Sequence, residues 1–374
     1  MRKPSKTLHH RGSEVASHWQ LMRWRFTKHK LGVASAFVVV LLYFIAIFCE
    51  FLAPYTPVSY SSKYMNAPPQ KIGFIVRDEK GSHFQLHVKG YSSVMNKAAG
   101  RWEHSIDNEI IIPIKFFARG DTYKMWGIFE SDIHLIGPED VSQPFYLWGT
   151  DRMGRDLMSR VLTGTRLSMS IGLIGVFLSL FLGVFLGGFS GYYGGRFDTV
   201  MQRVIEVLRS IPAIPLWMAL AAAVPKSWSI MQTYFAITII LSLIGWTGLA
   251  RVVRGRFLAL KTEDFVTVAK LNGCSESRIV FKHMVPSFLS HIIAQTTLSI
   301  PRMIISETSL SFLGLGLRAP AISWGVLLQE AQNIRTIANA PWLLIAPSVF
   351  VIAAVLSMNF LGDALRDSAD PYNT

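Results

Sequence analysis

Residues 167–189 read LSMSIGLIGVFLSLFLGVFLGGF, a stretch of 23 residues without a charged side chain. At 1.5 Å per residue, about 20 apolar residues in a helix cross the roughly 30 Å hydrocarbon core of a bilayer. Hydrophobic residues make up 51% of the 374-residue chain and charged residues only 16%, where soluble domains average about 25% charged. This composition excludes a disordered chain and an ordinary soluble enzyme, and it predicts a membrane protein.

Five further apolar runs accompany this one. They are Leu31–Cys49, Ile211–Val224, Ile230–Ala250, Phe288–Ile305 and Pro341–Gly362. The run at 211–224 is short. Taken alone it could be a buried or re-entrant helix, and extended back through Val204 it could span with a kink at Pro212 and Pro215. We count it as a span and expect six transmembrane helices.

The distribution of Lys and Arg predicts the orientation of the chain. The first 30 residues carry eight basic side chains against the single acid Glu14, and the loops at 190–204 and 251–287 are also basic. The loop at 225–229 contains only Lys226. Because positive loops stay on the cytoplasmic side, both termini should be cytoplasmic. A cleaved signal peptide fits poorly, since its apolar core is shorter than this first run.

The runs divide the chain into segments. We expect a basic cytoplasmic tail at 1–30, a first transmembrane helix at 31–53, an extracytoplasmic insertion at 54–166, a five-helix membrane core at 167–362 that contains the cytoplasmic loop 251–287, and a cytoplasmic tail at 363–374. Ile72–Val76 and His83–Lys89 flank a turn and predict a β-hairpin, and Glu109–Phe117 predicts another strand. The insertion could pack, dock a partner or receive a substrate.

Several kinds of chemistry lack a sequence signature. No Gly-Lys dipeptide occurs, so there is no Walker A phosphate loop, and no HExxH, CxxC or Gly-x-Ser-x-Gly motif occurs. Cys49 and Cys274 do not suggest a disulfide framework. We expect no enzyme activity, no cofactor and no metal site. Acids deep within the spans are nearly absent, which weakens the case for a proton-driven carrier.

The loop at 251–287 is the most informative segment. A basic amphipathic helix follows the membrane span, a short helix is expected over Asp264–Leu271, and Gly273 should end it. Ser275 or Ser277 can start a third helix that runs to Pro286. Such a loop could lie on anionic lipid headgroups, or it could form a rigid knob for a cytoplasmic partner.

This loop resembles the EAA loop of ABC-importer permeases, in which Ala-(x)3-Gly precedes a proline by thirteen residues. The matching positions are Ala269, Gly273 and Pro286. Residues 265–273, FVTVAKLNG, resemble the YVEAARALG of the dipeptide/oligopeptide/nickel permeases, and residues 283–286, HMVP, resemble their HILP. Thr267 stands where that family usually has Glu, and Val268 where it has Ala.

Other segments resemble the DppC/OppC-type members of that family. They are residues 149–168, beginning GTDRMGRD, residues 191–195, GYYGG, residues 309–325, beginning SLSFLGLG, and residues 361–371, beginning LGDALRD. The resemblance covers about residues 20–60 and 145–374 in the same order. The long insertion resembles that of YejE-type members.

The resemblance implies an all-α polytopic protein with the MetI-like permease fold of six transmembrane helices and a small β-containing extracytoplasmic insertion. It implies a permease of the bacterial cytoplasmic (inner) membrane that moves peptides or related small solutes. Its partners would be two cytoplasmic ATPase subunits docking on the 263–286 loop, a second and different permease, an extracytoplasmic solute-binding protein and membrane lipid, with no nucleic acid. The alternatives are a proton-coupled secondary transporter acting alone and a membrane-anchored receptor.

The resemblance and the positions of charged side chains relative to the spans together indicate candidate functional residues. The candidates for ATPase coupling are Glu263, Asp264, Ala269, Lys270, Gly273, His283 and Pro286, and the candidates for the pathway or its gating are Glu206, Arg209 and Glu307. From the residues themselves, Glu206 and Arg209 should pair with each other or with headgroups. Glu307 should form a structural pair with Arg302 or with the partner permease. The glycine pairs 172/175 and 183/187 should serve helix packing.

Overall fold

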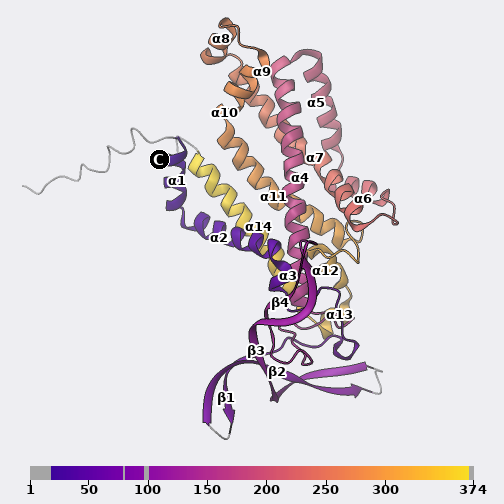
Figure 1. The fold of residues 1–374 in the computed structure, drawn as a ribbon. Coiled ribbons are helices and arrows are strands. Elements are labelled where there is room, and N and C mark those ends of the chain that lie inside the picture. Colours follow the sequence, from indigo (N-terminus) through magenta and orange to yellow (C-terminus); the bar gives the residue numbers. More distant parts are fainter. Residues whose placement is uncertain (1–17, 79–80, 97–100, 370–374) are drawn as a thin grey trace, which may run out of the picture.

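The computed structural model describes residues 18–78, 81–96 and 101–369, and it is mostly helical (Figure 1). The first 17 residues of the basic tail, residues 79–80 of the expected turn and residues 370–374 lie outside the described residues. The helices are α1 His18–Lys28, α2 Lys30–Ile47, α3 Cys49–Leu52, α4 Leu157–Tyr193, α5 Gly195–Ser210, α6 Ala213–Ala222, α7 Ile230–Leu260, α8 Asp264–Leu271, α9 Glu276–Arg278, α10 Val285–Ser287, α11 Leu289–Phe312, α12 Trp324–Glu330, α13 Ile334–Asn339 and α14 Trp342–Ala369. A 3-10 turn covers Ser62–Tyr64, and a π-helical stretch covers Ile279–Met284.

Four helices among the described residues are long and apolar enough to cross a membrane, namely α2, α4, α7 and α14. The pair α5 and α6 would make a fifth as one broken span or a re-entrant loop, because it bends by 88° at Ile211–Pro212. The break falls at Pro212, one of the two prolines at which a kink was expected, whereas Pro215 lies within α6. α11 is a continuous helix of 24 residues, but Pro301, Arg302 and Glu307 interrupt its apolar sequence, and it is not among these four helices. The sixth expected span therefore stays a prediction.

The glycines of α4 allow its neighbours to approach closely. A Cβ at Gly187 would lie 2.4 Å from the carbonyl oxygen of Ala250 in α7, and one at Gly172 would lie 2.8 Å from Ile304 in α11. Since no side chain can occupy that space, the helix axes approach closely along this stripe. The predicted packing role of the glycine pairs is confirmed.

The insertion forms an antiparallel sheet of order β1-β2-β3-β4. The strands are β1 Ile72–Asp78, β2 Gly81–Asn96, β3 Arg101–Met125 and β4 Phe129–Pro138. β1 and β2 form the predicted hairpin, and the third predicted strand lies within β3. β3 pairs with β2 along its first half and with β4 along its second half.

The sheet and the loop helices lie at opposite ends of the molecule. Figure 1 shows α8, α9 and α10 at one end of the long helices and the sheet beyond the other end. A surface on the α8 side and a surface on the sheet side therefore face opposite sides of any membrane that the helices cross.

The two cysteines, Cys49 and Cys274, are both free.

Candidate functional site

α8 is a short helix that buries one face and exposes the other. Val266 and Ala269 are 0% and 8% exposed, whereas Val268 is 53% and Leu271 is 82% exposed. Apolar side chains with this exposure on a helix of eight residues form a surface that suits a protein partner. The charged candidates Asp264 and Lys270 are exposed on the same helix, and Glu263 is exposed at the position directly before it.

Gly273 ends α8 as predicted, in the left-handed region at φ +70°. The N–H of Cys274 donates to the carbonyl of Ala269 at 3.1 Å, and the N–H of Gly273 donates to the carbonyl of Lys270 at 3.0 Å. This pair of bonds is the Schellman motif, which reverses the chain tightly after a helix. A Cβ at Gly273 would meet nothing within 4 Å. Its backbone conformation, and not its lack of volume, is therefore what favours glycine.

The third predicted helix begins after Ser275 and continues through α9, the π-helical stretch and α10. His283 is half-buried in the π-helical stretch, and Pro286 is exposed in α10, one residue before α10 ends at Ser287. α11 starts directly afterwards at Leu289. The third helix was expected to run to Pro286, but the helical backbone continues through this proline and breaks at Phe288, between α10 and α11.

The loop is held to the helices by a buried core. This core contains Val253 and Phe257 of α7, Val266 of α8, Ile279 and Met284 of the π-helical stretch, and Ile292 of α11. Lys261 Nζ donates to the carbonyl of Tyr192 at 2.7 Å, and Tyr193 Oη donates to Glu276 at 2.9 Å. Because these contacts join α8 to α4, α7 and α11, a force on α8 would reach the membrane helices.

The pathway candidates Glu206 and Arg209 do not pair with each other. Glu206 accepts from Arg203 at 2.7 Å, one turn earlier in α5, and both side chains are substantially exposed. The i,i+3 spacing places these two side chains on the same face of the helix. The expectation of a Glu206–Arg209 pair was therefore wrong.

Glu307 is fully buried and is held by hydroxyl groups, not by Arg302. Ser311 and Ser323 donate to its Oε1 at 2.8 and 2.9 Å, and Ser168 lies 3.5 Å from its Oε2. Ser311 lies in α11, Ser323 directly precedes α12, and Ser168 lies in α4. The expected ion pair with Arg302 is not formed, because Arg302 faces outward from α11. Glu307 joins three helices through hydrogen bonds.

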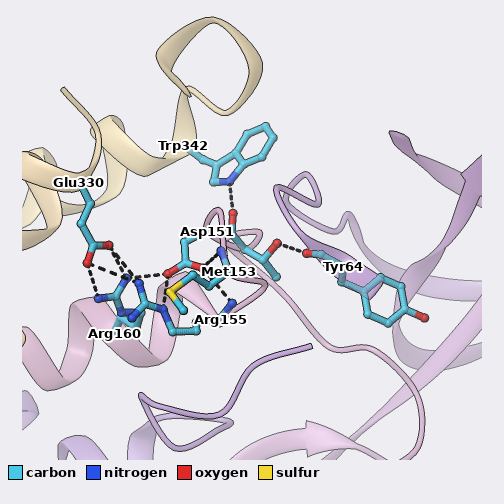
Figure 2. A network of polar contacts seen from close by, with 8 residues as sticks. Tyr64, Asp151, Met153, Arg155, Arg160, Glu330 and Trp342 are labelled. Atoms are coloured by element: carbon cyan, nitrogen blue, oxygen red, sulfur yellow. Dashed lines mark hydrogen bonds and ion pairs between the residues drawn. The ribbon is translucent and has the colours of Figure 1, made fainter. Parts of the chain in front are cut away.

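A buried cluster of charged groups lies at the sheet end of α4 (Figure 2). Arg160 Nη1 lies 2.6 Å from Asp151 Oδ2 and 2.6 Å from Glu330 Oε2. Arg155 Nε contacts the same Asp151 oxygen at 2.6 Å, and its Nη2 lies 3.3 Å from Glu330. Two cations thus face two anions, and the Arg160 side chain is only 2% exposed.

The loop that supplies Asp151 is itself tied down. Asp151 Oδ1 accepts from the backbone N–H groups of Met153 and Arg155 at 2.8 and 3.0 Å. Thr150 donates to the carbonyl of Tyr64, and the indole of Trp342 donates to the carbonyl of Thr150 at 3.1 Å, as Figure 2 shows. The cluster therefore joins the insertion, α4, α12 and α14.

Asp156 caps the start of α4 beside this cluster. Its Oδ2 accepts from the N–H and hydroxyl of Ser159 at 2.7 and 2.6 Å. Its Oδ1 is buried without a hydrogen-bond partner. Burial raises the pKa of Asp156 to about 7, because a carboxylate loses its hydration there.

The sequence pointed to only part of this site. Asp151, Arg155 and Arg160 lie in the segment that resembles known permeases, but Glu330 was not singled out, because it lies 170 residues from Arg160. The pair between Arg254 and Asp198, at 2.5 Å, was also missed. Each arginine of the four-residue cluster contacts both carboxylates, so the cluster connects the segments that carry these residues.

Comparisons with known proteins give a consistent result. The family model described as "Binding-protein-dependent transport system inner membrane component" matches residues 179–372, and "N-terminal TM domain of oligopeptide transport permease C" matches residues 17–69. The chain is 37% identical over 242 residues to "Oligopeptide transport system permease protein OppC" of Haemophilus influenzae, covering 65% of this chain and 75% of that protein. It is 30% identical over 352 residues to "Dipeptide transport system permease protein DppC" of Lactococcus lactis subsp. cremoris, covering 93% and 88%. A structure of the MetNI methionine ABC transporter in inward-facing conformations matches with a TM-score of 0.47 and 16% identity, covering 57% of this chain and 98% of that one.

Proposed function

The chain belongs to the family of binding-protein-dependent transport system inner membrane components, and from that premise we propose that it is the permease of an ABC importer for peptides. As a member of this family it is a multi-pass inner-membrane permease and not an enzyme, and the ATPase activity belongs to separate subunits. The oligopeptide and dipeptide names of its relatives support peptides as the cargo. The proton-coupled carrier considered from the sequence has no support in these matches.

The observation that carries the proposed coupling role is the exposed apolar face of α8. Leu271 and Val268 project from a helix whose other face is anchored in the core of the loop. In our proposal this helix sits in a cleft of an ATPase subunit, with Glu263, Asp264 and Lys270 pairing at the rim. Gly273 sets the angle at which the chain leaves that cleft, and His283 and Pro286 set its return toward α11.

The mechanism follows from rigid attachment. When the ATPases close on ATP, they move α8, and the shared core passes that movement to α4, α7 and α11. The helices then exchange between inward-open and outward-open arrangements, and ATP binding biases that equilibrium from a distance. At the other end, the Arg160 cluster keeps the start of α4 and the end of α12 together, so the helices would tilt as a unit.

We propose that both termini and the loop 251–287 face the cytoplasm, with residues 54–166 on the opposite side, in the segments expected from the sequence. The solute-binding protein would dock on that opposite side. A second, different permease would complete the pathway. Glu206 and Arg209 would lie near the cytoplasmic mouth, and Glu307 would hold three helices in register beside the pathway.

One co-purification experiment tests the coupling assignment. The tagged chain is expressed with its ATPase subunits and extracted in mild detergent. Leu271→Asp should abolish recovery of the ATPases, because a buried unpaired carboxylate would disrupt an apolar contact. The matched control is Ile334→Asp in α13, since Ile334 is 83% exposed and Leu271 is 82% exposed. Full recovery of the ATPases with Leu271→Asp would contradict the assignment.

A second experiment tests the cargo and the energy source. The complete complex is reconstituted in proteoliposomes with a labelled peptide and its binding protein. Uptake should require ATP and should persist when the proton gradient is collapsed. Uptake by the chain alone without ATP would identify it as a secondary carrier.

A further inference from the structure

The end of the β3–β4 hairpin lies against the first apolar helix and not within the rest of the sheet. Its tip, defined as residues 126–129, reads Trp-Gly-Ile-Phe. In Figure 1 the β3–β4 ribbon curves back from the sheet toward α3 and the adjacent end of α4. The indole N–H of Trp126 donates to the carbonyl of Ile47, the last residue of α2, at 2.8 Å.

A row of aromatic rings connects the side of α2 with this tip. Phe44 and Phe48 have ring centroids 4.9 Å apart, Phe48 and Trp126 are 6.1 Å apart, and Trp126 and Phe129 are 6.3 Å apart. The row therefore runs from within α2 to the end of the hairpin without a gap.

The part of this row within α2 belongs to a surface suited to lipid. Phe37, Val40 and Phe44 are 69%, 66% and 47% exposed on a helix with the length and composition of a membrane span. An apolar helix face with this exposure is stable only in hydrocarbon or against another protein. The tip extends the same surface, because Ile128 is 73% and Phe129 is 60% exposed.

Polar contacts locate the membrane–water boundary at the level of the tip. Arg166 Nε donates to the carbonyl of Ala46 at 2.8 Å, and its guanidinium pairs with Glu50. Charged pairs of this kind avoid the hydrocarbon core, so α2 should leave the core at this turn. Tryptophan is enriched at this depth because its ring is apolar and its N–H is polar.

The backbone of the tip is also unusual. Trp126 has φ +53° and Gly127 has φ +75°. A positive φ is uncommon for a residue other than glycine, and the surrounding contacts must hold it in place. Here the strained residue is the one whose indole reaches Ile47. The local conformation therefore directs the ring row toward the end of α2.

We propose that the hairpin tip inserts into the headgroup and acyl boundary of the bilayer, on the side where α2 ends, and so anchors the insertion to the membrane surface. The occupant of this surface is lipid. The apolar side chains of the hairpin tip contact lipid acyl chains, and the indole of Trp126 lies at the depth of the lipid ester carbonyls. The insertion is thereby held against the membrane instead of standing free above it.

Depth-dependent quenching tests this proposal. In a Cys274→Ser background, the full chain receives single cysteines carrying the fluorophore NBD and is placed in nanodiscs with doxyl-labelled phosphatidylcholine. The endogenous Cys49 is 0% exposed, and labelling of the background protein measures its contribution. The test positions are Ile128→Cys and, as a second site, Phe129→Cys. The controls are Phe37→Cys in α2, and Ile75→Cys in β1, where the side chain is 63% exposed.

The expected result is a loss of emission at both tip positions that is strongest with doxyl groups near the lipid carbonyls. Phe37→Cys should lose emission most with doxyl groups deep in the acyl chain, which also proves insertion, and Ile75→Cys should lose none. Tip positions that behave like Ile75→Cys would overturn the proposal. Tip positions shielded from both doxyl lipid and aqueous iodide would overturn it too, because they would lie under protein.

Discussion

Replacing Arg160 with methionine should destabilise the protein strongly. Methionine keeps an apolar stem but removes contacts of 2.6 Å to Asp151 and 2.6 Å to Glu330. Breaking a buried ion pair costs about 3–5 kcal/mol, because the remaining charge stays desolvated. Arg155 still pairs with both carboxylates, and Glu330 is 24% exposed. The lower end of that range, about 3 kcal/mol, is therefore expected.

The assay is thermal unfolding of the purified chain in one detergent at one heating rate. A loss of about 3 kcal/mol corresponds to a fall in Tm of about 4 °C for a chain of this size, because the unfolding entropy is about 2.1 cal/mol/K per residue. The matched control is Arg203→Met, because Arg203 also pairs with a glutamate at 2.7 Å but is 77% exposed. Exposed pairs contribute about 0–1 kcal/mol, so this variant should lose no more than about 1 °C. Equal shifts in the two variants would refute the reasoning that burial makes the cluster important.

Three further outcomes are expected. Gly273→Val should abolish peptide uptake while membrane insertion is kept, since a β-branched residue resists φ +70°, and Gly273→Asn should retain most uptake; wild-type uptake by the valine variant would contradict the coupling role. Gly187→Leu should prevent recovery of folded protein, since its Cβ would lie 2.4 Å from a backbone oxygen of α7, whereas Gly255→Leu meets nothing within 4 Å and should fold; similar yields would count against the close helix contact. The pKa of Asp156 is raised from 3.8 to about 7, so the folded state binds the proton more tightly, and its contribution to stability is present below pH 4 and lost by about pH 7, at about 1.4 kcal/mol per unit. Asp156→Asn should flatten the fall in Tm over that window, and an unchanged pH profile would show that Asp156 is ionised throughout.

Local features of the sequence determined the secondary structure closely. The short helix expected over Asp264–Leu271 has those bounds, and Gly273 follows it with a positive φ. The hairpin about residues 78–81 and the break at Pro212 were also predicted. These features result from helix capping, turn-forming residues and hydrophobic periodicity, each of which depends on residues only a few positions apart. They can therefore be read without knowing the fold.

Pairing between charged groups was not predictable in the same way. Glu206 was expected to pair with Arg209 or with headgroups, and Glu307 with Arg302 or with the partner permease. Within this chain, Glu206 instead pairs with Arg203, and Glu307 is bound by three serines. A charged side chain on a helix can pair with several neighbours at a similar free energy. Which pair forms depends on how the other helices pack around it.

The membrane class and the bounds of the short helix α8 could be predicted from the sequence alone, because hydrophobic runs and helix ends are local properties. Only the tertiary structure brought Glu330 to Arg160 and Trp126 to Ile47. These contacts join residues 170 and 79 positions apart. No periodic pattern in the sequence predicts contacts between residues so far apart in the chain. These contacts form because apolar helices and a curved hairpin pack against one another.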